Sequence, residues 1–198
     1  MEAKIVALLE GGAIDELEAL CRSRPKETAS SLIKTLLEEP PFDQLHVRRS
    51  LGEVRQGNYV HAFNGVLTSL LEATGDEALQ FLVAALPDSR WWVFEQAALA
   101  LANLRSAGIP AVPALLDALG TPDRRLRALD SLAAIGPGAD SAVPAIGGYL
   151  RDPDAITRSY AVRALGAIGS PESREALREA VNQEIDPDVR VQFQNLLR

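Results

Sequence analysis

The chain has 198 residues, of which 47% are hydrophobic, and its 27 acidic and 20 basic side chains leave a formal charge of −7. The hydrophobic fraction excludes a disordered protein, because it is large enough to form a continuous core. The negative charge argues against a protein that neutralises many phosphates, so we do not expect nucleic acid as the partner.

Residues 1–75 are helical in composition but carry no regular turn motif. Helices are predicted at 3–9, 14–21, 26–38, 43–56 and 59–73, separated by Gly and Pro residues. A repeat array begins near residue 76, and such an array needs a polar terminal unit to cover its last hydrophobic face. We therefore interpret residues 1–75 as a degenerate helical N-terminal cap.

From residue 76 onward, a repeat governs the sequence. Matching positions are occupied, at steps of 31, 33 and 32 residues, by Phe94, Arg125, Arg158 and Arg190. The first helix of each pair is predicted at 77–86, 112–119, 143–150 and 172–182, and the second at 90–105, 123–135, 154–168 and 188–198. Apolar residues recur at helical spacing in these segments, and no strand pattern competes with them. The period indicates stacked helix pairs.

Turns that contain Pro precede the second helices. Three of them have the sequences Thr121-Pro122-Asp123, Asp152-Pro153-Asp154 and Asp186-Pro187-Asp188. Pro cannot continue a helix, and an Asp carboxylate accepts hydrogen bonds from the unpaired N–H groups of the next first turn. The pattern therefore predicts Asp123, Asp154 and Asp188 as N-caps. Left-handed C-terminal residues are predicted at Gly120, Gly136 and Gly169.

The repeat unit resembles the HEAT-repeat family, particularly its short bacterial form. The resemblance is carried by the Asp-Pro-Asp, Arg, Ala-Leu and Ile-Gly pattern at 152–169 and by the identical segments 111–114 and 142–145, each Ala-Val-Pro-Ala. It implies an all-α fold, a right-handed α-α superhelical solenoid, with four HEAT-like repeats at 76–198 continuous with the cap in one elongated domain. It further implies a polar ladder of Asp and Arg side chains between repeats and second helices that line the concave side.

Two adjacent indoles, Trp91 and Trp92, are the sharpest candidates for recognition. Neighbouring side chains on a helix point about 100° apart, so one indole is expected to face solvent or a neighbouring loop. Indoles dominate binding hot spots. The alternative is structural: one Trp packs into the core and the other covers a helix edge.

Residues between the buried positions of the second helices form a predicted binding ridge of mixed charge. Its members are Glu95, Gln96, Asn103, Arg127, Asp130, Ser159, Val162, Arg163, Gln192 and Asn195. Arg127 belongs to a cluster with Arg124 and Arg125, for which a solvated, salt-linked face is the preferred interpretation over phosphate binding. A ridge of mixed charge suits a protein or peptide partner better than a nucleic-acid duplex.

Catalytic and metal-binding patterns are missing from the sequence. His46 and His61 are too few to form a metal site, and the paired acids lie at helix ends or turns, where they act as caps or are solvated. Neither a nucleophile motif, a phosphate loop nor a dinucleotide fingerprint occurs. We expect no enzyme activity, no metal and no cofactor.

The single cysteine, Cys21, is expected to be a small buried hydrophobe and is typical of a reducing compartment. No N-terminal export signal and no apolar run of membrane-spanning length is present. The dominance of arginine among the basic residues suggests a GC-rich bacterial genome. These features predict a bacterial, cytoplasmic protein without membrane contact.

The function predicted from this pattern is a noncatalytic protein-interaction scaffold or regulator that binds its partner along the concave face. An alternative is a chromophore (bilin) lyase-like subunit, because certain bilin lyases are built from similar repeats. A DNA-binding or glycosylase-like module also resembles this architecture, but it would need a basic groove. The C-terminal end stops inside a helix without a cap, which makes it a candidate surface for homodimer formation.

Overall fold

The computed structural model describes residues 4, 14–24, 27–28, 31 and 76–197. The chain divides into two compact units, Met1–Ala100 and Leu101–Arg198. The predicted boundary between cap and repeats, at residue 75, adjoins residues outside the described ones and stays a prediction. His46, His61 and all or most of the predicted helices at 3–9, 26–38, 43–56 and 59–73 also fall outside them.

The described part of the N-terminal unit contains helix α2 (Ile14–Ser23), helix α6 (Asp76–Ala85) and most of helix α7 (Trp91–Asn103). In α2, acidic residues lie in the first turn and Arg22 in the last turn, where each charge opposes the helix dipole. Leu17 and Cys21, one turn apart, are fully buried. The expectation that Cys21 is a buried hydrophobe is therefore confirmed.

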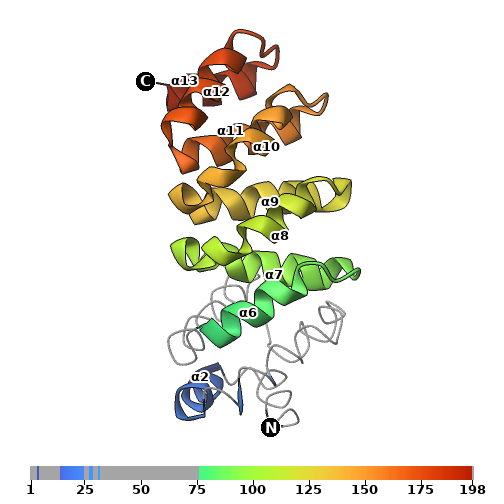
Figure 1. Cartoon of the computed structure of the whole chain (residues 1–198), viewed down its shortest axis with the longest axis vertical. Helices are drawn as coiled ribbons and strands as arrows, with labels where there is room; N and C mark the ends of the chain where they lie inside the picture. Colours follow the sequence, from blue (N-terminus) through green and yellow to red (C-terminus); the bar gives the residue numbers. More distant parts are fainter. Residues whose placement is uncertain (1–3, 5–13, 25–26, 29–30, 32–75, 198) are drawn as a thin grey trace, which may run out of the picture. The chain divides into compact units, whose positions relative to one another are not determined.

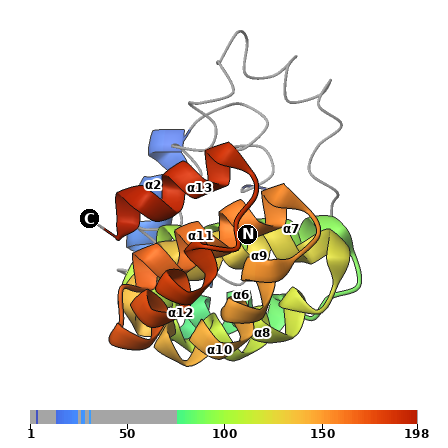
Figure 2. The same cartoon turned by 90° about the horizontal axis from the view of Figure 1, so that it is seen from above.

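The C-terminal unit contains three consecutive helix pairs: α8 (Val112–Leu119) with α9 (Pro122–Ile135), α10 (Val143–Gly148) with α11 (Ala155–Ile168), and α12 (Pro171–Val181) with α13 (Pro187–Leu196). The first helices form one layer and the second helices the other (Figures 1 and 2). No strand occurs among the described residues. The predicted all-α class is confirmed, and the pairs follow the predicted register.

Short 3-10 helices connect these pairs where the sequence suggested longer first helices or plain turns. η1 (Arg105–Ala111) precedes α8, η2 (Gly136–Ala142) precedes α10, and η3 (Tyr149–Arg151) extends α10. The predicted helix at 143–150 therefore stops being α-helical at Gly148. Two consecutive glycines at that point favour this change, because glycine weakens an α-helix interior.

The predicted N-caps are corrected in two of three repeats. Asp154 caps α11, and its carboxylate accepts hydrogen bonds from the backbone N–H groups of Ile156 and Thr157. Those from the Thr157 backbone and hydroxyl hold the pKa of Asp154 below its ordinary value. Asp123 and Asp188, in contrast, lie inside the first turns, and the caps are Thr121 and Asp186.

The ladder arginine explains this correction. The backbone N–H groups of Arg125, Arg158 and Arg190 donate to the carbonyls of Thr121, Asp154 and Asp186, always four residues earlier. The cap is therefore always four residues before the arginine in the sequence. Relative to this cap, the Asp-Pro-Asp motif is displaced by two residues between 152–154 and 186–188. Of the glycines predicted to be left-handed, Gly136 and Gly169 have positive φ. Gly120 is a correction: its φ is −68°, and the chain continues there in a tight turn, closed by a hydrogen bond from the Thr121 N–H to the Ala118 carbonyl.

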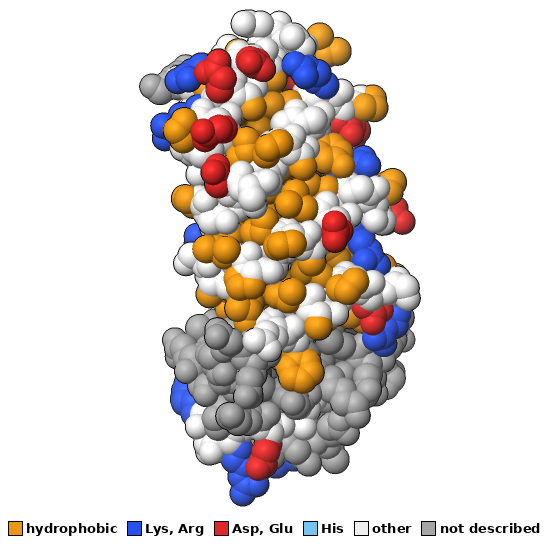
Figure 3. All heavy atoms as spheres, viewed as in Figure 1, with side chains coloured by type: hydrophobic (Ala, Val, Ile, Leu, Met, Phe, Trp, Pro, Cys, Tyr) orange, Lys and Arg blue, Asp and Glu red, His pale blue; other side chains and the backbone are white. Residues whose placement is uncertain are grey.

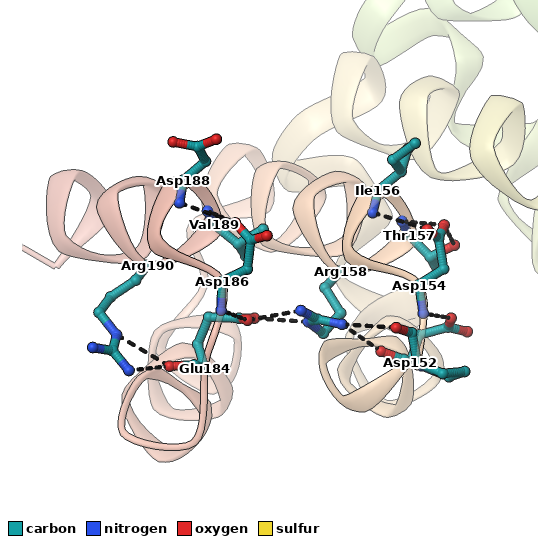
Figure 4. Close-up of polar contacts among 11 residues, drawn as sticks. Asp152, Asp154, Ile156, Thr157, Arg158, Glu184, Asp186, Asp188, Val189 and Arg190 are labelled. Carbon is teal, nitrogen blue, oxygen red and sulfur yellow. Dashed lines mark hydrogen bonds and ion pairs between the residues drawn. The ribbon is translucent and has the colours of Figure 1, made fainter.

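The three arginines also satisfy backbone carbonyls near the ends of the first helices. Each guanidinium donates to the carbonyl six residues earlier. Arg125 Nε donates to Leu119 at 3.1 Å. Arg158 Nη1 donates to Asp152 at 2.9 Å and Arg190 Nε to Glu184 at 3.1 Å (Figure 4). Carbonyls at a helix end lack intrahelical donors. The arginine thus fixes the second helix of a repeat against the end of its first helix.

Side chains at the same carbonyl positions connect one repeat to the next. Glu184 accepts two hydrogen bonds of 2.8 Å from Arg158 of the preceding repeat (Figure 4). Asp152 Oδ2 lies 3.6 Å from Arg125 Nη1 of the repeat before it. In each acid, the carboxylate pairs with the arginine of the preceding repeat and the carbonyl accepts from the arginine of its own repeat. The predicted polar ladder is confirmed for these repeats, with Glu184 as an acid that the motif did not identify.

Close packing at Gly108 gives a first prediction for stability. A Cβ at this buried position would lie 2.7 Å from the Leu101 carbonyl oxygen and 3.3 Å from Ile135 Cγ1. Because backbone cannot move aside easily, Gly108→Ala is expected to lower the free energy of unfolding by about 1–3 kcal/mol in urea denaturation. Gly147→Ala is the control, since no atom lies within 4 Å of its added Cβ. Equal losses in both variants would contradict the clash.

Candidate functional site

The second helices of the C-terminal unit bring the predicted ridge residues of three repeats onto one face. Two rows follow the ladder arginines at two and five positions: Arg127, Tyr160 and Gln192, then Asp130, Arg163 and Asn195. Residues three apart on a helix lie on the same side. We call Arg127, Asp130, Ser159, Tyr160, Arg163, Gln192 and Asn195 the polar ridge.

Asp130 links α9 to α11 at the centre of this ridge. Its two carboxylate oxygens accept separately, one from Arg127 Nη1 at 3.1 Å and the other from Arg163 Nη2 at 2.5 Å. The Arg163 guanidinium also lies 4.4 Å above the Tyr160 ring, which adds a cation–π contact. Asp130 therefore divides its single negative charge between two guanidinium groups from consecutive repeats.

Ser159 links α11 to α13. Its hydroxyl donates to Gln192 Oε1 at 2.9 Å, which leaves the amide N–H groups of Gln192 outside that contact. Asn195 is exposed one turn further along α13. The ridge therefore places carboxamide and hydroxyl groups next to the Arg–Asp cluster.

A hollow of about 350 Å³ lies between α11 and α13. It is lined by Ser159, Tyr160, Val162, Arg163, Gln192, Asn195 and Leu196. Gly166 lets α13 come close here, because a Cβ at that position would lie 2.6 Å from Leu196 Cδ1. The volume is in the range of small binding pockets.

Sequence reasoning missed two residues of this hollow, Tyr160 and Leu196. Tyr160 could have been found, since it shares the register of Arg127 and Gln192. Leu196 could not, because only the packing of α13 against α11 shows that its side chain borders the hollow. Val162, which was predicted on the ridge, is fully buried and lines the same space.

The remaining predicted residues lie on α7. Trp91, Trp92 and Glu95 belong to the N-terminal unit, and Asn103 ends the helix in the C-terminal unit. Trp91 is 64% exposed, as expected for one of the two indoles, whereas the Trp92 side chain lies outside the described residues. Glu95 is half-buried and Asn103 is exposed. Their role in binding stays a prediction.

The layer of first helices offers a second candidate surface. Over α8 and α10 it is mostly apolar (Figure 3), and the only charged residue in these two helices is Asp117. Exposed residues there include Pro113, Pro144 and Ala145, from the duplicated Ala-Val-Pro-Ala segments. This surface has fewer polar groups than the ridge, so the ridge is the stronger candidate for a recognition surface.

Metal and membrane sites are not found in the described part of the chain. No group of three or more His, Cys, Asp or Glu residues there is placed to hold a metal ion. No described helix has the length and apolar character that crossing a membrane requires.

Comparison with known proteins decides the nature of the repeats. A family model described as HEAT repeats matches residues 112–198. Residues 112–198 are therefore similar to HEAT repeats. This stretch contains α8 to α13 and the whole polar ridge, so the resemblance inferred from sequence is confirmed there. No match was found among curated proteins.

Solved structures with similar folds include designed repeat proteins. An engineered protein is 22% identical with a TM-score of 0.57, and the alignment covers 99% of this chain and 94% of that one. A designed armadillo repeat protein in complex with the peptide (KR)4 is 20% identical with a TM-score of 0.56, covering 94% and 90%. A structure of computationally designed armadillo repeat proteins for modular peptide recognition is 21% identical with a TM-score of 0.55, and the alignment covers 94% of this chain and 91% of that one. These likenesses confirm a helical solenoid fold.

Proposed function

We propose that this protein is a noncatalytic scaffold or regulator that binds a protein or peptide partner along the polar ridge of its HEAT repeats. The observation that carries the proposal is the shared Asp130 carboxylate, which joins charged residues of two repeats beside an open hollow. HEAT and armadillo folds are typical of protein-interaction scaffolds and are typically noncatalytic. Stacked repeats of this kind present extended binding surfaces.

The chemistry of the ridge supports a polypeptide partner. Alternating charges and carboxamides can each be matched by side chains and peptide groups, which offer both donors and acceptors. A nucleic acid would instead require an excess of basic side chains that neutralise several phosphates. No feature of the described residues favours a bilin lyase-like or glycosylase-like activity. Homodimer formation through the C-terminal end stays a separate prediction.

Partner capture tests this proposal. The tagged full chain is used to purify partners, and the same purification is repeated with the Arg163→Ala/Gln192→Ala variant. Arg163 is exposed and Gln192 is half-buried, and neither belongs to the hydrophobic core, so circular dichroism should show unchanged helicity while the partner is lost. Ala145→Glu, on the apolar layer, is the control and should retain the partner.

The opposite pattern would contradict the proposal. A partner lost with Ala145→Glu and kept with the ridge variant would place recognition on the first helices. Trp91→Ala adds a separate arm, because an exposed indole that belongs to the interface should cost at least about fivefold in affinity when truncated. Unchanged binding by Trp91→Ala would remove the indole from the interface without affecting the ridge.

A further inference from the structure

Arg163 is held in place but has donors to spare. Its guanidinium carries five N–H groups, of which one donates to Asp130, and its plane lies on the Tyr160 ring. The side chain is nevertheless 51% exposed. A guanidinium that is already held by two contacts loses little conformational entropy on binding, so its remaining N–H groups can donate to a planar anion at low entropic cost.

The charge on Arg163 indicates which ligand group fits. Its carboxylate partner, Asp130, divides one negative charge between two guanidinium groups, so Arg163 is only partly neutralised by it. Hydrogen bonds between guanidinium and carboxylate groups are stronger than those between neutral groups. A basic side chain at the same place would meet the exposed guanidinium and be repelled. Arg163 therefore selects an acidic ligand, although the chain as a whole is acidic.

The hollow beside Arg163 adds an apolar requirement. Val162 and Leu196 line it together with the Tyr160 ring, while Gln192 and Asn195 provide polar groups at its border. Arg163 also lines this hollow, so one ligand can reach the guanidinium and the apolar wall at the same time. A peptide meets this geometry when a carboxylate and an aliphatic side chain are one or two positions apart, because side chains two positions apart in an extended chain lie on the same face.

We propose that the polar ridge recognises a partner segment with an aspartate or glutamate one or two positions from a leucine, isoleucine or valine. The carboxylate binds Arg163, the aliphatic side chain enters the hollow between α11 and α13, and the carboxamides of Gln192 and Asn195 bind the peptide main chain. This inference rests on the proposed function and specifies the chemistry of the partner at the same surface. It is the opposite of the basic peptide (KR)4 in complex with the designed armadillo protein.

Peptide selection tests the sequence preference. Random dodecapeptides displayed on phage are selected against the immobilised full chain, and binders to the Arg163→Glu variant are subtracted. Enrichment of acidic residues one or two positions from aliphatic ones is the expected result. Enrichment of Lys- and Arg-rich peptides, or no enrichment, overturns the inference. If the ridge nevertheless captures a protein partner, the proposed function stands and only its specificity is wrong.

An affinity cycle tests the contact itself. One selected peptide, fluorescein-labelled, is measured by fluorescence polarisation with its acidic residue intact or replaced by the amide. Arg163→Gln in the protein and Glu→Gln in the peptide should each weaken binding by about 5- to 10-fold. On the Arg163→Gln protein, the peptide change should cost nothing further, because the contact is already lost.

Two further variants separate this contact from general effects. Arg178→Gln removes the same charge from an exposed site on α12 and should change affinity by less than about twofold. Leu196→Asn should weaken the affinity for the peptide that retains its aliphatic residue, but not the affinity for a peptide in which that residue is replaced by serine. Two outcomes would show that the peptide carboxylate does not bind Arg163. One is that the affinity losses from Arg163→Gln and from the peptide amide add up. The other is that Arg178→Gln weakens binding as much as Arg163→Gln does.

Discussion

Glu184→Ala is expected to lower the free energy of unfolding by about 3 kcal/mol or more. Glu184 and Arg158 are 2% and 11% exposed, and their two hydrogen bonds of 2.8 Å connect consecutive repeats. Without the carboxylate, the Arg158 guanidinium stays buried and loses its acidic partner. The turn before α13 is weakened as well, because Glu184 Oε1 accepts from the Asp186 N–H at 2.8 Å.

Urea denaturation at pH 7 measures this effect. The matched control is Glu175→Ala, since Glu175 pairs with Arg178 at 3.4 Å on an exposed surface, where such pairs contribute about 0–1 kcal/mol. A double variant, Arg158→Met/Glu184→Met, should recover much of the loss, because buried charges are replaced by apolar groups of similar length. Similar losses for Glu184→Ala and Glu175→Ala would contradict a special role of the buried pair.

The pH dependence provides a second readout for the same pair. Hydrogen bonds from Arg158 hold the pKa of Glu184 below its ordinary value. A carboxyl group whose pKa is lowered in the folded state stabilises the protein fully above its unfolded pKa, near 4.3, and loses this contribution as pH falls through the folded pKa. The unfolding free energy of the wild type should therefore fall below about pH 4.5 more steeply than that of Glu184→Gln.

Phe193→Ala is expected to lower the free energy of unfolding by about 3–5 kcal/mol. The Phe193 ring on α13 is fully buried, and it occupies the register that holds Ala128 and Ala161 in the two preceding repeats. Removal of the ring eliminates its burial and leaves a cavity in the contact of α13 with its neighbours. Urea denaturation measures the loss, and hydrogen exchange should show that α13 is the helix whose protection falls most.

Val191→Ala is the control for this prediction. Val191 lies on the same helix but is exposed, so its replacement should change stability by no more than about 0.5 kcal/mol. If Phe193→Ala also costs less than about 1 kcal/mol, the ring is not part of the core that holds α13. The stability loss of Phe193→Leu should lie between those of Val191→Ala and Phe193→Ala, because leucine keeps most of the buried apolar area.

The helix pairs were predictable because their signals are local. Pro at a first turn, an acceptor at the cap and glycine at the end act within a few residues, and every repeat restates them at a period of 31 to 33 residues. Errors occurred where two local signals compete. Asp186 and Asp188 are both plausible caps, and the motif alone favoured the one that aligns with Asp154 in Asp-Pro-Asp. The constant spacing to the ladder arginine was the better guide.

The proposed binding surface was predictable only as a set of residues. Ridge positions follow from helical spacing, which is why Arg127, Asp130 and Arg163 were identified individually. Their connection through one carboxylate was not, because it depends on how closely α9 and α11 approach, to give 2.5 Å between Arg163 Nη2 and Asp130 Oδ1. The role of Glu184 was missed for the same reason, since its partner Arg158 lies 26 residues away in the sequence.

The sequence by itself therefore determined the all-α class, the period, the helix pairs and the side of each second helix that is polar. These depend on backbone preferences and hydrophobic spacing, which each repeat carries within itself. Only the tertiary structure decided which acid pairs with which arginine, where Phe193 is accommodated, and that a hollow opens between α11 and α13. Those properties arise from contacts between repeats, where distances of a few tenths of an ångström separate a hydrogen bond from none.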